Sequence, residues 1–156
     1  MEFSMSSILI YGYGNPGRQD DGLGPALVDA LEKWLAAAAP RPGLDLDANY
    51  QLNAEDALAV AGHDTVIFVD ATADTDGAPF TFRPLAPAAT IAFSTHALAP
   101  ETVLALCREL YGKSPAAHLL AIRGQSWEPN AAMTPAATAN LATALAFIKS
   151  FLGTPF

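Results

Sequence analysis

Three short apolar segments constrain the fold of this chain more than any other feature. They are residues 7–12 (SILIYG), 65–70 (TVIFVD) and 118–123 (HLLAIR). Each is too short for a helix and reads as a strand buried on both faces of a sheet. Helical periodicity separates them, and we predict helices over residues 22–39, 100–111 and 134–152. This alternation predicts an α/β fold in three layers, with a mainly parallel twisted sheet and helices on both faces.

Four weaker segments complete the predicted order of elements. Residues 44–52 form a weak strand, and a short helix follows to residue 61 with Asn53 as its N-cap. Residues 79–83 (PFTFR) alternate and begin with a proline, which is typical of an edge strand. Residues 90–93 are a candidate short strand. With no repeat and no linker, we expect residues 1–156 to form a single domain, with residues 1–6 frayed.

The charge of the chain excludes several functions. Sixteen Asp and Glu residues against eight Lys and Arg residues make the net charge −8, so we expect no nucleic-acid partner and no cationic membrane surface. The single cysteine, Cys107, excludes a disulfide framework or a cysteine-based metal cluster. No long apolar stretch or leader is evident, and we expect a cytoplasmic protein. The acid excess is either a solvated surface or a site that attracts a cation or a basic partner.

A glycine-rich loop follows the first apolar segment. Residues 12–17 (GYGNPG) match the dinucleotide pattern G-x-G-x-x-G. However, Asp20 and Asp21 follow at once, where a pyrophosphate needs a positive helix terminus, and no strand ends in an acid about 20 residues further on. A nucleotide- or small-ligand-binding module that uses Gly12–Gly17 therefore stays an alternative only.

Two carboxylates and one imidazole are predicted to meet at one edge of the sheet. Asp21 lies in the loop after the first apolar segment, Asp70 ends the second, and His96 precedes the helix at residue 100. Ligands of open α/β sheets bind at the carboxyl ends of the strands, and this donor set suits nickel, zinc or iron. Each residue also has an ordinary structural explanation. Asp20 or Asp21 could cap the helix that begins near residue 22, which we favour for Asp20, and Asp70 and His96 could be turn and loop residues.

Other reactive side chains have structural interpretations. His63 follows the helix that ends at residue 61, and we interpret it as a cap of that helix. His118 opens a strand and is assigned to packing, and Cys107 lies on the apolar face of its helix, as an inert core residue would. The chain has no G-x-S-x-G elbow and no His-Glu-x-x-His, so neither a serine hydrolase nor a zincin is supported.

The whole loop is more specific than its first six residues. Residues 12–24 (GYGNPGRQDDGLG) resemble the opening motif of the nickel–iron hydrogenase maturation endopeptidases, G-x-G-N-x-x-x-x-D-[DE]-G-x-G, with the spacing preserved throughout. Gly17 and Gln19 depart from it, since relatives often have leucine and glycine there. The segments VDA at Asp70 and STH at His96 also match, and residues 100–111 and 118–135 resemble the family's C-terminal half. The resemblance extends from residue 7 to about residue 152.

This resemblance implies a function. The chain is expected to be an endopeptidase that removes the C-terminal extension of a nickel–iron hydrogenase large-subunit precursor. In the family, nickel already inserted into the precursor is the recognition signal, so Asp21, Asp70 and His96 are both the expected metal contacts and the expected catalytic residues. The free enzyme is then expected to be a metal-free monomer. An inactive relative that only binds a partner is a further alternative.

Overall fold

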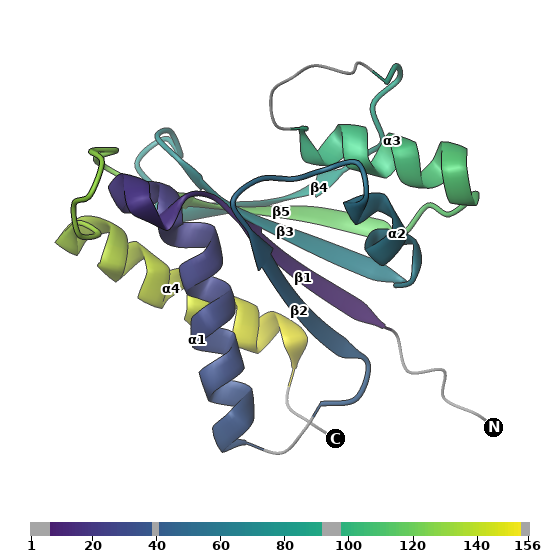
Figure 1. The fold of residues 1–156 in the computed structure, drawn as a ribbon. Coiled ribbons are helices and arrows are strands. Elements are labelled where there is room, and N and C mark those ends of the chain that lie inside the picture. The colour runs from purple at the N-terminus through teal and green to yellow at the C-terminus, as the bar shows by residue number, and fades with distance from the viewer. Residues whose placement is uncertain (1–6, 39–40, 92–97, 154–156) are drawn as a thin grey trace.

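The computed structural model describes residues 7–38, 41–91 and 98–153, which form a five-stranded sheet with helices on both faces (Figure 1). The strands are β1 (Ile8–Tyr13), β2 (Leu44–Asn49), β3 (Thr65–Thr72), β4 (Phe80–Leu85) and β5 (Ala116–Arg123). The helices are the 3-10 helix η1 (Pro16–Gly22) and the α-helices α1 (Leu23–Ala37), α2 (Asp56–Ala61), α3 (Pro100–Tyr111) and α4 (Pro135–Leu152). The strand order is β2-β1-β3-β5-β4, and every neighbouring pair is parallel except β4 and β5. The predicted α/β fold is confirmed.

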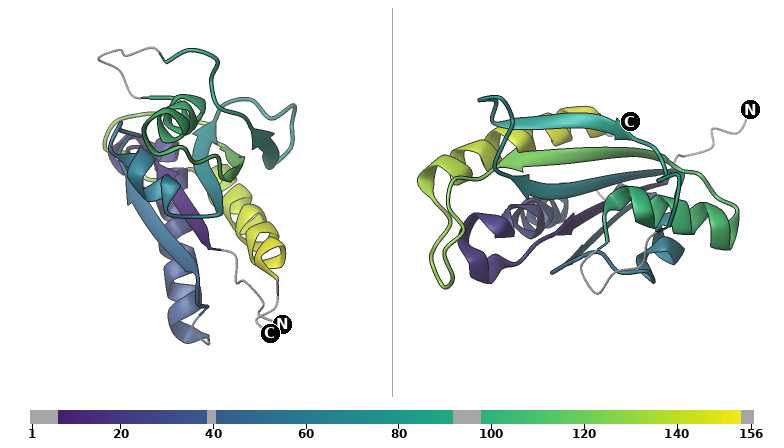
Figure 2. Two further views of the ribbon diagram at one scale, coloured as in Figure 1. Left: turned by 90° about the vertical axis from the view of Figure 1, so that its right-hand side faces the viewer. Right: turned by 90° about the horizontal axis from the view of Figure 1, so that it is seen from above.

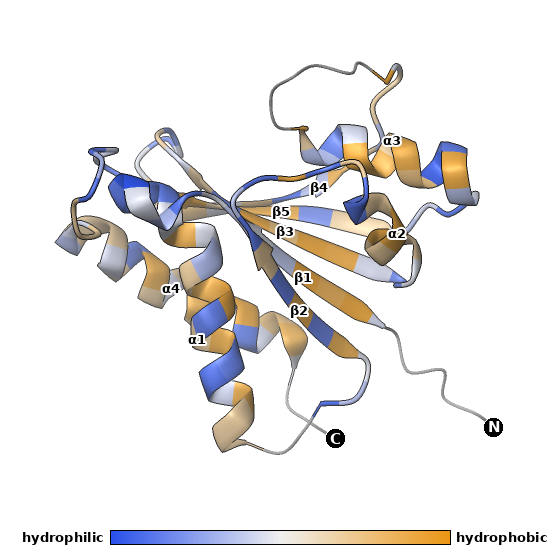
Figure 3. Cartoon of the chain, viewed as in Figure 1, coloured by the Kyte–Doolittle hydropathy of each residue, from blue (hydrophilic) through white to orange (hydrophobic). Residues whose placement is uncertain are grey.

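Two hydrophobic cores lie on the two faces of the sheet. Helices α1 and α4 cover one face and α2 and α3 the other, as Figures 1 and 2 show. Ile10 of β1 and Ile67 of β3 pack with α1 and α4, whereas their neighbours Tyr11 and Phe68 pack with α2 and α3. Figure 3 shows β1 and β3 as largely hydrophobic and β2 as striped, which fits two central strands and one edge strand. None of the described helices has the length and apolar character to span a bilayer.

Two glycines let the start of α1 lie directly on the strands. A Cβ atom on Gly24 would be 2.5 Å from the carbonyl oxygen of Val69 in β3 and 2.6 Å from that of Tyr13. A Cβ atom on Gly12 would in turn overlap the carbonyl oxygen of Gly24. Because no side chain separates these backbones, η1 and α1 are held against the carboxyl ends of β1 and β3.

The edge strand β4 tolerates Pro84 for a geometrical reason. The Arg123 N–H donates to the Pro79 carbonyl oxygen, and the register pairs Thr81 with Ala121 and Pro84 with His118. Backbone groups of an antiparallel strand point alternately toward and away from the partner, so Pro84 faces away from β5 and its missing N–H costs no ladder bond. The predicted edge strand is confirmed and extends to Leu85.

Three details of the predicted elements are wrong or concern residues outside the described part of the chain. The strand near residue 44 ends at Asn49 instead of residue 52. The side chain of Asn53 does not cap α2: its backbone N–H donates to Asp56 Oδ2 at 2.7 Å, so the acid in the first turn binds the chain that precedes it. Residues 90–91 are not in a strand, and residues 92–93 lie outside the described part of the chain, as do residues 1–6.

Candidate functional site

Asp70 lies at the carboxyl end of β3, directly after four buried residues. Its half-buried carboxylate accepts a hydrogen bond from the Ala71 N–H, at 2.8 Å, and another from the Tyr13 hydroxyl. Burial raises the pKa of Asp70 to about 6. The two hydrogen bonds act to lower it, and the charge of Asp21 adds to the rise. Two donors therefore hold the carboxylate in a place where its charge is disfavoured, a combination that marks functional-site candidates.

Asp21 belongs to η1 and is also half-buried. Its Oδ2 accepts a hydrogen bond from the Asn15 N–H at 2.8 Å. Gly22 is the N-cap of α1 and no side chain bonds the first turn of that helix, so Asp21 does not cap it. Since the charge of Asp21 raises the pKa of Asp70, the two carboxylates lie close enough to repel each other. The structure thus brings together two of the three predicted site residues.

Asp20 has a different role from the predicted helix cap. The side chain is fully buried, and its Oδ2 accepts bonds from the Gln125 N–H (2.7 Å), the Ser126 N–H (3.1 Å) and the Thr134 hydroxyl (2.7 Å). Oδ1 accepts a fourth bond, from the Thr134 N–H at 2.8 Å. Burial opposes the charge, but these hydrogen bonds outweigh it and lower the pKa of Asp20 below its usual value. The predicted cap is wrong because η1 directs this carboxylate toward residues 124–134, the β5–α4 loop, whose N–H groups need acceptors.

Gln19 adds a strained link between η1 and the β5–α4 loop. Its φ of 55° and ψ of −114° belong to a region that favours glycine, so the backbone of Gln19 is strained. The side chain of Gln19 accepts a bond from the Glu128 N–H at 3.1 Å, and the Asn130 N–H donates to the Gly17 carbonyl at 2.8 Å. The two loops are therefore joined at several points around Asp21.

His96, the third predicted site residue, lies outside the described residues, so the structure does not place it. Within residues 7–38, 41–91 and 98–153, no group of three or more His, Cys, Asp or Glu side chains could hold a metal ion. Asp21 and Asp70 alone cannot close the coordination shell of a tightly held ion. The two carboxylates therefore need further donors, and the sequence offers His96 for one of them.

Sequence reasoning missed Tyr13, which hydrogen-bonds Asp70, and two charged residues that affect Tyr13. Burial and the nearby charge of Asp70 raise the pKa of Tyr13; Glu101 raises it further, and Arg83 lowers it. The charges of Glu101, in the first turn of α3, and of Arg83, in β4, thus act on the Tyr13 hydroxyl in opposite directions. For Tyr13 the signal was present, because the period of two along β1 puts it on the same face as Tyr11. The charge effects of Arg83 and Glu101 depend on how the elements are arranged in space, which local pattern does not reveal.

The glycine loop is poorly suited to a phosphate group. The Asn15 N–H already donates to Asp21, and the Gly17 N–H donates to the Asn15 side chain at 2.9 Å. A phosphate-binding loop needs such N–H groups free and a positive helix terminus beyond them. Here a carboxylate occupies one of them, which argues against the nucleotide-binding alternative.

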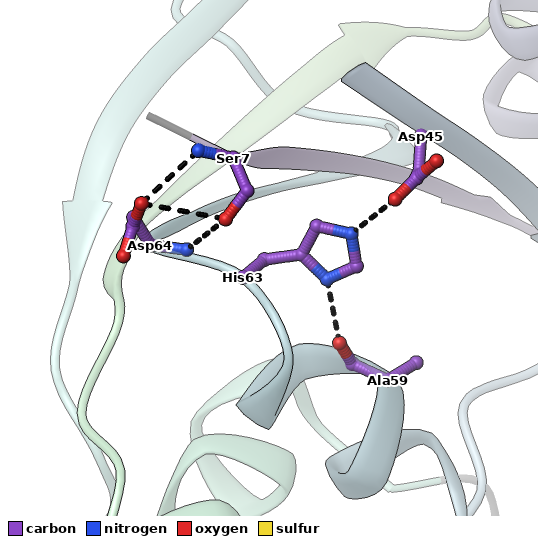
Figure 4. Close-up of polar contacts among 5 residues, drawn as sticks. All are labelled: Ser7, Asp45, Ala59, His63 and Asp64. Carbon is purple, nitrogen blue, oxygen red and sulfur yellow. Dashed lines mark hydrogen bonds and ion pairs between the residues drawn. The ribbon is translucent and has the colours of Figure 1, made fainter. Parts of the chain in front are cut away.

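His63 lies at the opposite edge of the sheet, where β3 begins (Figure 4). Its Nδ1 is 2.7 Å from the Ala59 carbonyl oxygen in α2, and its Nε2 is 2.7 Å from Asp45 Oδ2 in β2. The prediction that His63 caps α2 is confirmed, and the Asp45 contact ties α2 to the edge strand as well. Next to it, the Ser7 N–H donates to Asp64 while the Asp64 N–H donates to the Ser7 hydroxyl, which joins the starts of β1 and β3 (Figure 4).

His118 and Cys107 are packing residues, as predicted. The ring of His118 is stacked on Phe82, with centroids 4.7 Å apart and an interplanar angle of 4°. Cys107 is fully buried in α3, and burial raises the pKa of its thiol. Neither side chain belongs to the site around Asp70.

Several solved structures share this fold. The NiFe hydrogenase maturation protease HycI from Thermococcus kodakarensis is 22% identical, over 96% of this chain and 94% of that chain, with a TM-score of 0.73. The hydrogenase maturating endopeptidase HybD from Escherichia coli is 23% identical, over 94% and 91%, with a TM-score of 0.71. An endopeptidase from Escherichia coli is 25% identical over the same shares, with a TM-score of 0.67.

No protein-family model matches the sequence, and no curated protein does. The similarity is therefore carried by the three-dimensional structure and by the motif at residues 12–24. The predicted resemblance is confirmed: over nearly its whole length, the chain has the fold of the nickel–iron hydrogenase maturation endopeptidases.

Proposed function

We propose that this chain is an endopeptidase that removes the C-terminal extension of a nickel–iron hydrogenase large-subunit precursor, after nickel has been inserted. The observation that carries the proposal is a pair of half-buried carboxylates that repel each other, Asp21 in η1 after β1 and Asp70 at the carboxyl end of β3. They stand at the positions where the motif of these endopeptidases has its metal contacts. The solved structures with this fold include proteases of hydrogenase maturation, which supports the same reaction class.

The donor set suits recognition of a cation that the substrate carries. Asp21 and Asp70 repel each other, and a divalent ion between them would replace that repulsion by attraction to both. His96 would add a neutral nitrogen donor, and the ligands that the precursor already provides would complete the shell. Holding the ion in this way fixes the neighbouring peptide bond in one place, and such positioning can lower a barrier by up to about 7–11 kcal/mol.

The test uses the precursor in nickel-loaded and metal-free form. We expect the purified chain to cleave only the loaded form, because only that form offers an ion to Asp21 and Asp70. Asp21→Ala should lower the cleavage rate by about 100-fold or more, since losing one contact misplaces the scissile bond. Asp29→Ala is the matched control, because Asp29 is an exposed acid that forms an ion pair with Lys33 on α1, and it should retain full activity.

Equal cleavage of both precursor forms, or full activity of Asp21→Ala, would overturn the proposal. Binding of the loaded precursor without any cleavage would instead support the partner-binding alternative. The histidine assignment is checked by His96→Ala against His63→Ala. Only the first variant should lose activity, because His63 lies at the opposite edge of the sheet.

A further inference from the structure

Tyr13 is the neighbour of Asp70 across the sheet. β1 and β3 are parallel, and the last paired residues are Gly12 and Val69, so Tyr13 and Asp70 occupy the next position of the same register. Both side chains lie on the face covered by α2 and α3, since their neighbours in the strands alternate onto the other face. The motif leaves this position unspecified, so nothing in the family pattern assigns a task to the tyrosine.

The hydroxyl of Tyr13 is held in place from two sides. The aromatic ring stands edge-on to Phe68, with centroids 6.5 Å apart and an interplanar angle of 73°. The backbone of Tyr13 is packed so closely under α1 that a Cβ on Gly24 would be 2.9 Å from its nitrogen. The hydroxyl of this packed ring hydrogen-bonds Asp70, and the Ala71 N–H donates to the same carboxylate at 2.8 Å. The carboxylate of Asp70 is thereby restricted in its rotation.

A comparison with Tyr11 shows how the hydrogen bond between Tyr13 and Asp70 differs from a bond that is purely structural. It precedes Tyr13 by two residues on the same face and also hydrogen-bonds a carboxylate, that of Asp56. Asp56, however, is engaged with the Asn53 N–H at the start of α2, whereas Asp70 lies beside Asp21 in the candidate site. The two tyrosines make similar bonds, and only one of them reaches a residue of the site.

We propose that Tyr13 is a positioning residue: its hydroxyl orients the Asp70 carboxylate toward the nickel ion that the precursor carries. This inference rests on the proposed function. Groups that orient a metal ligand through a hydrogen bond are worth roughly 10- to 100-fold in metal affinity or activity. Tyr13 therefore contributes to discrimination between loaded and metal-free precursor without touching the substrate ion itself.

The experiment measures the dissociation constants of loaded and metal-free precursor for the wild-type chain, Tyr13→Phe and Tyr11→Phe. Both variants keep their rings, so the packing on Phe68 is preserved, and thermal unfolding verifies that each is folded. We expect Tyr13→Phe to weaken binding of the loaded precursor by at least about 10-fold and to leave binding of the metal-free form unchanged. Tyr11→Phe should change both constants by less than about twofold, although it loses a comparable bond.

A double-mutant cycle with Asp70→Asn shows whether Tyr13 acts through Asp70. In the Asp70→Asn background, Tyr13→Phe should have no further effect on the loaded precursor. The inference is overturned if Tyr13→Phe binds the loaded precursor normally, if both precursor forms weaken alike, or if the effect persists without Asp70. Failure of the proposed function gives a different result, because the wild-type chain itself would then not discriminate between the two precursor forms.

Discussion

Asp20 and Asp21 are adjacent in the chain, yet their surroundings give them opposite properties. Asp20 is fully buried and accepts four hydrogen bonds from the β5–α4 loop, whereas half-buried Asp21 lies within electrostatic reach of Asp70. The first acid therefore joins two loops, and the second is available to a ligand. Gln19 also joins η1 to the β5–α4 loop, and its hydrogen bond with the Glu128 N–H compensates in part for its strained backbone.

Asp20→Asn is expected to destabilise the chain strongly. An amide offers only one acceptor oxygen, but donors reach both oxygens of Asp20, so at least one buried donor must lose its partner. We expect the free energy of unfolding, measured with urea, to fall by about 3 kcal/mol. Asp29→Asn, on the exposed side of α1, should change it by less than about 0.5 kcal/mol. A loss for Asp20→Asn as small as that of the control would show that the two loops are joined mainly by other contacts.

At the scale of the elements, close backbone packing places the start of α1 on the sheet. The glycine motif at residues 12–24 resembles the sequence of a nucleotide-binding loop. Gly12 and Gly24 have a different purpose: they let the helix and the strands touch without intervening side chains. η1 was missed at the level of sequence, since a single irregular 3-10 segment has no periodicity to detect. Its position matters all the same, because η1 carries Asp21 to the edge where β3 ends.

Gly24→Ala tests this packing because helix propensity and tertiary contact predict opposite signs. Alanine is favoured over glycine inside a helix by about 1 kcal/mol. A Cβ on Gly24 would nevertheless meet backbone atoms of Val69 and Tyr13 at 2.5–2.9 Å, and backbone cannot move aside easily. We expect a net loss of about 2–3 kcal/mol in thermal or urea unfolding. The matched control is Gly62→Ala, whose Cβ would make only ordinary contacts from 3.5 Å outward; if both variants behaved alike, the close contact would not be the cause.

At the scale of the whole molecule, the stability of the fold should depend on pH through two acids that act in opposite directions. The folded-state pKa of Asp20 is lowered, so its contribution to stability is present above its unfolded pKa and is lost as the pH falls through the folded value. The folded-state pKa of Asp70 is raised from 3.8 to about 6. Between these values the unfolded chain releases the proton while the folded chain retains it, so rising pH destabilises the fold at Asp70.

Asp70→Asn removes the second effect and leaves the first. We expect the variant to be more stable than the wild-type chain at pH 7, by an amount on the order of 1–3 kcal/mol, although it should lose function. The difference should shrink as the pH is lowered from 6 and should be small by about pH 4, where Asp70 becomes protonated in the unfolded state as well. Unfolding curves over pH 4–8 measure it, and a difference that stays constant over this range would contradict the raised pKa.

The alternation of strands and α-helices along the chain, the mainly parallel sheet and its burial on both faces could be read from the sequence, because local periodicity reports which faces of an element are buried. Asp70 could also be chosen in this way, since an acid that ends an apolar strand has no packing role, and Asp21 could be chosen from its place in the loop that follows the first apolar segment. Roles that depend on contacts between distant segments could not be read in this way. The task of Asp20 depends on the β5–α4 loop, more than a hundred residues away.

The same limit explains Tyr13, which comes from a different strand than Asp70 and reaches it only because β1 and β3 are neighbours in the sheet. Periodicity along a segment carries no information about which other segment it will face, whereas hydrogen bonds and charges act between whichever groups the fold brings together. The chain therefore specifies its layers and its two acids locally. The different roles of Asp20 and Asp21 arise only when η1 meets the β5–α4 loop. The hydrogen bond between Tyr13 and Asp70 likewise forms only when β1 and β3 pair.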